Sequence, residues 1–125
     1  PPYRSILRRG KNIVHKIHQM LEQTKERLYV LASGEILSEF LQDLQNLVSA
    51  GKKVVILSDN FEIPSAICHK TTTEKNQIRL ITDSSYVLTG VISGNEHDTC
   101  LYSGQPNLVS VMKEALKNKI ELLSK

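Results

Sequence analysis

Apolar residues along this chain follow two different spacings, and the changes between them mark out the elements. Apolar positions recur every three or four residues over 11–26, 35–50 and 106–124, which predicts three helices with one buried face each. One short apolar run follows each of the first two helices, at 28–32 and 54–57, and predicts a buried strand. The helix between these strands favours a right-handed βαβ unit with parallel strands.

The stretch 78–104 has a different pattern. Three apolar, β-branched runs are separated there by the turn formers Asp83-Ser84-Ser85 and Gly94-Asn95. This spacing predicts an antiparallel meander of three strands. The preceding segment, 59–77, has neither pattern, and we interpret it as a long loop with one helical turn near Pro64.

The predicted order of elements is α-β-α-β-loop-β-β-β-α. It indicates an α/β domain with a mixed sheet flanked by helices on both faces. Residues 1–10 contain two prolines and three arginines without a sustained period, and we interpret them as a linker or an extended lead-in. Residues 11–125 are long enough for one domain with a single continuous core.

Composition and charge narrow the classes of function. The net charge is only +3, and the aromatic residues are 4 Tyr and 2 Phe without Trp, so direct binding of nucleic acid is not expected. No apolar run approaches the roughly 18 residues of a membrane span, so no membrane contact is expected. The 2 cysteines do not resemble a secreted framework, which favours a cytoplasmic protein. Because the chain does not begin with Met, we expect it to be a piece of a longer protein.

The carboxyl ends of the two parallel strands are where an open α/β sheet would hold a ligand. These ends carry Ser33-Gly34-Glu35 and Ser58-Asp59-Asn60. Their polar groups suit hydrogen bonding to a small polar ligand. The candidate ligand-binding residues are therefore Ser33, Glu35, Ser58, Asp59 and Asn60. In the competing interpretation, Ser33 is a helix N-cap and Asp59-Asn60 is a solvated turn.

The sequence provides no setting for catalysis or for a metal ion. It contains no Gly-x-Ser-x-Gly, Gly-x-Gly-x-x-Gly or Walker sequence, and its aspartates are scattered rather than paired. Cys68-His69 and His97-x-x-Cys100 contain zinc-ligand types, but adjacent residues chelate poorly and Cys100 lies in an apolar run. We expect no catalytic residue, no metal and no cofactor.

The run from Ile78 to Gly90 resembles the strand, aspartate turn and strand of phospholipase D-like domains. In that superfamily the first strand carries His-x-Lys-x-x-x-x-Asp. If Asp83 is placed on the family's aspartate, Asn76 stands at the histidine and Ile78 at the lysine. A shift by one residue places Gln77, Arg79 and Ser84 at the three positions instead.

The nucleophilic histidine is missing in both registers. A phosphodiesterase of this type attacks phosphorus with an imidazole, and neither Asn nor Gln can replace it. The resemblance therefore implies a domain that is not an enzyme.

One branch of the superfamily, the effector domain of TrmB-family transcriptional regulators, is similar to residues 10–123. The similarity rests on Gly10-Lys11-x-Ile13, Arg27-Leu28-Tyr29-Val30, the apolar pattern from Leu41 to Leu57, and the ending Leu101 to Val109. It implies a separate N-terminal winged helix-turn-helix domain that contacts DNA, with residues 1–10 as the linker from it. Members of that family respond to sugars or related metabolites, commonly as dimers.

Residues and resemblance together favour a non-catalytic effector-sensing and dimerisation domain that binds a small polar metabolite, such as a sugar, and forms a homodimer. An alternative is a phosphodiesterase or nuclease half-domain that uses another residue, such as His69 of the long loop. A further alternative is a plain protein-interaction module, in which the first or the last helix pairs across a two-fold axis.

Overall fold

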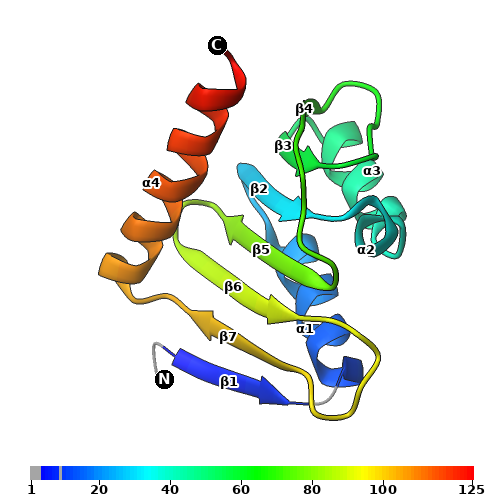
Figure 1. The fold of residues 1–125 in the computed structure, drawn as a ribbon, viewed down its shortest axis with the longest axis vertical. Coiled ribbons are helices and arrows are strands. Elements are labelled where there is room, and N and C mark those ends of the chain that lie inside the picture. Colours follow the sequence, from blue (N-terminus) through cyan, green and yellow to red (C-terminus); the bar gives the residue numbers. More distant parts are fainter. Residues whose placement is uncertain (1–3, 9) are drawn as a thin grey trace.

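The computed structural model describes residues 4–8 and 10–125, which form a mixed sheet with helices on both faces (Figure 1). The elements are β1 (Arg4–Arg8), α1 (Gly10–Gln23), β2 (Arg27–Ala32), α2 (Gly34–Ser38), α3 (Leu41–Ser49), β3 (Lys53–Ser58), β4 (Ile67–Lys70), β5 (Gln77–Thr82), β6 (Tyr86–Val91), β7 (Thr99–Ser103) and α4 (Pro106–Leu123). Within these residues the strands form one seven-stranded sheet, in the order β1-β7-β6-β5-β2-β3-β4.

The pairing of strands confirms both sequence-based motifs. β2 and β3 pair in parallel, with Leu28 opposite Val54 and Leu31 opposite Leu57. β5, β6 and β7 form the predicted antiparallel meander, and β5 joins it to the βαβ unit by pairing antiparallel with β2. The mixed α/β sheet is therefore confirmed.

The sheet divides the buried side chains into two clusters, where we had expected one continuous core. On one face, α1, α2 and α3 bury side chains such as Ile13, Phe40 and Leu44 against the strands. On the other face, α4 contributes Val109 and Leu116. Each fully buried side chain of this size stabilises the fold by about 1.5–3 kcal/mol, so both helical layers matter for stability.

The helix predicted over 35–50 is divided into α2 and α3, which corrects that prediction. Phe40, at φ −113° and ψ 14°, is not helical and stands between the two. Its side chain is almost fully buried, and its ring lies 4.9 Å from the ring of His18, measured between centroids. The change of direction at Phe40 lets both helices bury their apolar sides, whereas one apolar stripe in the sequence predicts one helix.

Two segments expected to lack regular structure contain strands. Within the expected loop 59–77, β4 pairs in parallel with β3, with Ile67 opposite Val55. Within 1–10, β1 pairs antiparallel with β7, with Arg4 opposite Ser103. Both are edge strands, and their sequences do not show the apolar runs of central strands. That residues 1–10 also connect to a further domain stays a prediction.

None of the helices among the described residues is long and apolar enough to cross a membrane.

Candidate functional site

Asp59 joins the two chain segments that contain the candidate residues, at the ends of β2 and β3. Its Oδ1 accepts hydrogen bonds from the N–H of Gly34 at 2.8 Å and from the N–H of Asn60 at 2.8 Å. The Ser58 hydroxyl donates to the same oxygen at 3.3 Å. The bond from Gly34 is the main reason that the pKa of Asp59 lies below its ordinary value. Asp59 thus fastens the end of β3 to the start of α2.

Ser33 has a structural contact of the same kind. Its hydroxyl oxygen accepts a hydrogen bond from the Ile36 N–H at 3.3 Å and caps α2. The next residue, Gly34, comes so close to the Asn60 carbonyl oxygen that a Cβ would lie 2.4 Å from it. Only glycine therefore fits between α2 and the loop after β3 without a shift of one of them.

The structure divides the five candidate residues between two hollows. Ser33 and Glu35 line one of about 580 Å³, which we call the acidic hollow. Its other polar side chains are Glu39, Asn76, Ser93 and Glu96. Ser58, Asp59 and Asn60 line a separate hollow of about 270 Å³ beside β4, together with Cys68 and His69.

Three chain segments supply the polar side chains of the acidic hollow, and Val14 of α1 adds an apolar one. The first runs from the end of β2 through α2, the second ends at Asn76 before β5, and the third follows β6. Asn76 has a left-handed backbone, at φ 67°, and its carbonyl oxygen accepts a hydrogen bond from the Ile92 N–H at 2.7 Å. This bond connects the second and third segments.

Buried Asp98 holds the loop after β6. It accepts hydrogen bonds from the Ser93 hydroxyl at 2.6 Å and from the Ser93 N–H at 2.7 Å. The bond from the hydroxyl is the main cause that lowers the pKa of Asp98. The position of Ser93 and Glu96 at the acidic hollow therefore depends on Asp98, for which we had predicted no role.

The charges of the acidic hollow are negative. Glu35, Glu39 and Glu96 line it, and among the residues whose side chains the structure describes, no Lys, Arg or His lines it. Carboxylates accept strong hydrogen bonds from hydroxyl and N–H donors and repel a phosphate. Among the described residues, no group of three or more His, Cys, Asp and Glu is arranged to hold a metal ion.

The structure distinguishes the two registers of the phospholipase D-like pattern. In the register that places Asp83 on the family's aspartate, Asn76 lines the acidic hollow and Ile78 is buried in the core. In the shifted register, Arg79 alternates with Ile78 and Leu80 and therefore points to the opposite face of the sheet. The first register is the one that brings the family's histidine position to the acidic hollow.

Asp83, which we predicted only as a turn former, makes contacts with a distant part of the chain. Its carboxylate accepts hydrogen bonds from three successive backbone N–H groups, of Lys25 at 2.9 Å, Glu26 at 2.7 Å and Arg27 at 3.1 Å. Desolvation raises the pKa of Asp83, but these bonds and the Arg27 charge outweigh it, and the pKa lies below its ordinary value. The turn after β5 is thereby fastened to the start of β2.

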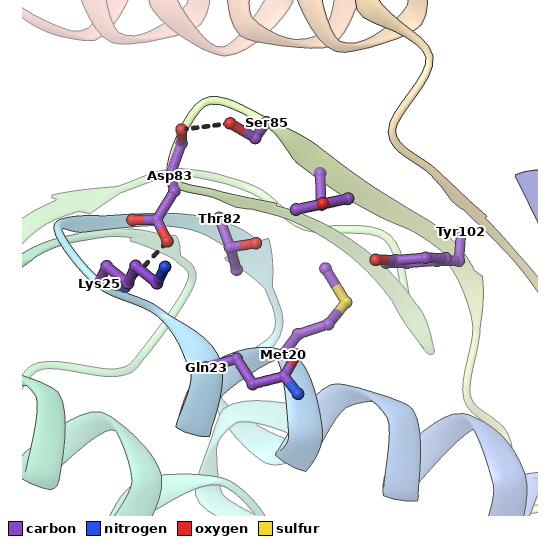
Figure 2. Close-up of a pocket in the computed structure, with 8 residues that line it drawn as sticks. Met20, Gln23, Lys25, Thr82, Asp83, Ser85 and Tyr102 are labelled. Atoms are coloured by element: carbon purple, nitrogen blue, oxygen red, sulfur yellow. Dashed lines mark hydrogen bonds between the residues drawn. The ribbon is translucent and has the colours of Figure 1, made fainter. Parts of the chain in front are cut away.

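Figure 2 shows a third hollow of about 560 Å³ beside Asp83, which the sequence did not predict. Tyr102 lines it and is stacked on Tyr86, with ring centroids 5.8 Å apart. The Lys16 Nζ lies 3.9 Å from the centroid of the Tyr102 ring. The only signal in the sequence was two tyrosines in apolar strands, and their stacking depends on the pairing of β6 with β7.

No family model matches the sequence, and no curated protein matches it. Several solved structures match the fold. TrmBL2, an archaeal chromatin protein whose structure shows a novel mode of DNA binding, has a TM-score of 0.73 at 18% identity. The match covers 95% of this chain and 52% of TrmBL2, so the chain spans about half the length of that protein.

Two further matches extend over nearly whole proteins. NucT from Helicobacter pylori has a TM-score of 0.79 at 13% identity, over 94% of this chain and 95% of NucT. Nuc from Salmonella typhimurium, a phospholipase D family member, has a TM-score of 0.61 at 14% identity, over 94% of this chain and 95% of Nuc. At such identities the likeness shows the fold alone, and the fold of this chain is that of phospholipase D-like domains.

Proposed function

We propose that this chain is a non-catalytic, effector-sensing and dimerisation domain of a transcriptional regulator, and that it binds a small neutral metabolite rich in hydroxyl groups, such as a sugar. The lining of the acidic hollow supports this most directly. Asn76 stands where the resemblance to phospholipase D-like domains would require a nucleophilic histidine, and three glutamates surround the same space.

The chemistry of the hollow favours one class of ligand. Glutamate oxygens accept hydrogen bonds from sugar hydroxyls, while the Ser33 hydroxyl can donate one and the Asn76 amide can donate or accept. A phosphate ester or a phosphodiester would bring further negative charge to three carboxylates. The proposal therefore includes discrimination between a neutral sugar and its phosphate.

The likeness to TrmBL2 supports the wider context of a regulator. Contact with DNA through a separate N-terminal domain and association into homodimers are part of the proposal. The cytoplasmic location stays an expectation from the sequence.

A thermal-unfolding screen tests the sensing function. Glucose, maltose, trehalose and sucrose are compared with glucose 6-phosphate, on the chain and on the variant Glu35→Gln. A neutral sugar at 100 times its dissociation constant adds about 2.7 kcal/mol of stability, which raises the unfolding temperature by several degrees. Glu35→Gln reduces that rise, while the control Glu22→Gln, at an exposed position of α1, does not. If no sugar stabilises the chain, sensing is contradicted.

The alternative of a phosphodiesterase half-domain has its own supporting observation. NucT and Nuc share this fold over 95% of their lengths, and His69 lines the hollow beside β4. Hydrolysis of bis(p-nitrophenyl) phosphate that disappears in His69→Ala would favour this alternative. We expect no hydrolysis by the unaltered chain or by the His69→Ala variant.

A further inference from the structure

A groove lies between α4 and the end of the sheet where β5 ends and β2 begins. Its volume is about 470 Å³. The apolar lining comes from both layers, with Tyr29 and Ile81 on the strands and Leu116 and Ile120 on α4. Because it also carries cations, we call it the basic groove.

The cations of the basic groove come from three separate elements. They are Arg27 of β2, Lys53 of β3, and Lys113 and Lys117 of α4. The two lysines of α4 are four residues apart and therefore lie on the same side of the helix, and Ile120 follows three residues later. A ligand in the groove would thus meet positive charge both from the strands and from α4, together with apolar side chains of both layers.

The three lysines among these cations have no carboxylate partner in the part of the chain that the structure describes, whereas the charge of Arg27 also acts on Asp83. Arg27 and Lys53 are directly opposite in the parallel pair of β2 and β3, an arrangement in which like charges repel. Among the described residues, Arg27 has an ion pair only with exposed Glu26, at 3.4 Å, and the three lysines have none. Glu114 and Glu121 also line the groove. The four cations and two glutamates together give its lining a net charge of +2.

We propose that the basic groove binds a small amphiphilic anion, with an apolar body on Tyr29, Ile81, Leu116 and Ile120 and an acidic head group among the four cations. A bound anion relieves the repulsion between Arg27 and Lys53, and its apolar body removes the groove's apolar side chains from water. A nucleic acid would use the cations but leave the apolar lining empty, so the combination favours an amphiphile.

This site is separate from the acidic hollow. Leu116 and Ile81 belong to the cluster on the α4 face, whereas Ile36, which lines the acidic hollow, belongs to the cluster on the opposite face. The failure of either proposal therefore leaves the other standing.

Titration of the ¹⁵N-labelled chain with hexanoate, octanoate and decanoate, below their micellar concentrations, tests the proposal by NMR. Affinity rises with chain length, by up to about fourfold for each methylene group that the groove buries. The amide signals of Leu116, Ile120 and Ser84, which also lines the groove, shift on binding. Acetate and decanol bind far more weakly. Affinity that does not depend on chain length, or shifts that avoid these residues, would overturn the proposal.

The variant Lys113→Gln/Lys117→Gln removes two cations and keeps the helix propensity of α4. Decanoate binds it roughly three- to tenfold more weakly, since each exposed charge contributes modestly. The matched control Lys75→Gln/Lys119→Gln has the same net charge, changes residues outside the groove and binds decanoate like the unaltered chain. Equal affinity in both variants contradicts the proposal, as does a duplex DNA that binds through these lysines when decanoate does not bind.

Discussion

Single aspartates determine much of the local geometry in this molecule. Asp83, Asp59 and Asp98 each accept several hydrogen bonds, mostly from backbone N–H groups. The sequence showed these residues only as turn formers or as scattered carboxylates. Their partners could not be predicted, because Lys25, Glu26 and Arg27 lie more than fifty positions before Asp83 and meet it only once β5 pairs with β2.

The variant Asp83→Asn tests the contact at the residue scale. Asn tolerates the left-handed backbone of Asp83, at φ 55°, so the change mainly removes charge-assisted hydrogen bonds from backbone N–H groups. We expect a loss of about 1–3 kcal/mol in the free energy of unfolding, measured by urea denaturation. The control Glu74→Gln, at an exposed position, should be neutral. An unchanged free energy in Asp83→Asn would show that the three contacts are not stabilising.

The pH dependence of stability follows from the same carboxylates. The pKa values of Asp59, Asp83 and Asp98 lie below the ordinary value of 3.8 in the folded chain. Their contribution is therefore complete above the unfolded pKa and is lost as pH falls through the folded values. We expect the free energy of unfolding to decrease below about pH 4, and less steeply in Asp83→Asn. Stability that increases on acidification through this range would contradict the assignment.

At the scale of elements, long apolar runs were predictable and short edge strands were not. The runs that predicted β2, β3 and the meander are central strands whose burial requires apolar side chains. β4 is an edge strand in which only part of each side chain is buried, so Ile67–Lys70 has no clear pattern. The division at Phe40 was missed for another reason, since the apolar spacing continues across it.

The close approach of α2 to the loop after β3 gives a prediction at this scale. In Gly34→Ala, the added Cβ meets the Asn60 carbonyl oxygen of the backbone, which cannot move aside as a flexible side chain would. We expect a loss of about 1–3 kcal/mol in the free energy of unfolding and weaker sugar binding in the acidic hollow. Denaturant unfolding and calorimetric titration measure the two effects. Normal stability together with normal binding would show that the approach is not tight.

Across the whole molecule, the sheet separates two hollows of opposite charge. The acidic hollow lies on the side of α1, α2 and α3, and the basic groove lies under α4. The sequence predicted that polar residues would gather at the ends of β2 and β3, and the structure places them there. It did not predict that these residues would be divided between the acidic hollow and the hollow beside β4. The course of the loops after β3 and β6 decides which side chains meet.

Isothermal titration tests most directly whether the acidic hollow is a non-catalytic sensor. The chain is titrated with glucose or the tightest-binding neutral sugar, and separately with glucose 6-phosphate. We predict saturable binding of the neutral sugar, binding of the phosphate at least about tenfold weaker, and weaker sugar binding in Glu35→Gln. Binding of the phosphate as tight as that of the neutral sugar, or sugar affinity that Glu35→Gln leaves unchanged, would contradict this function.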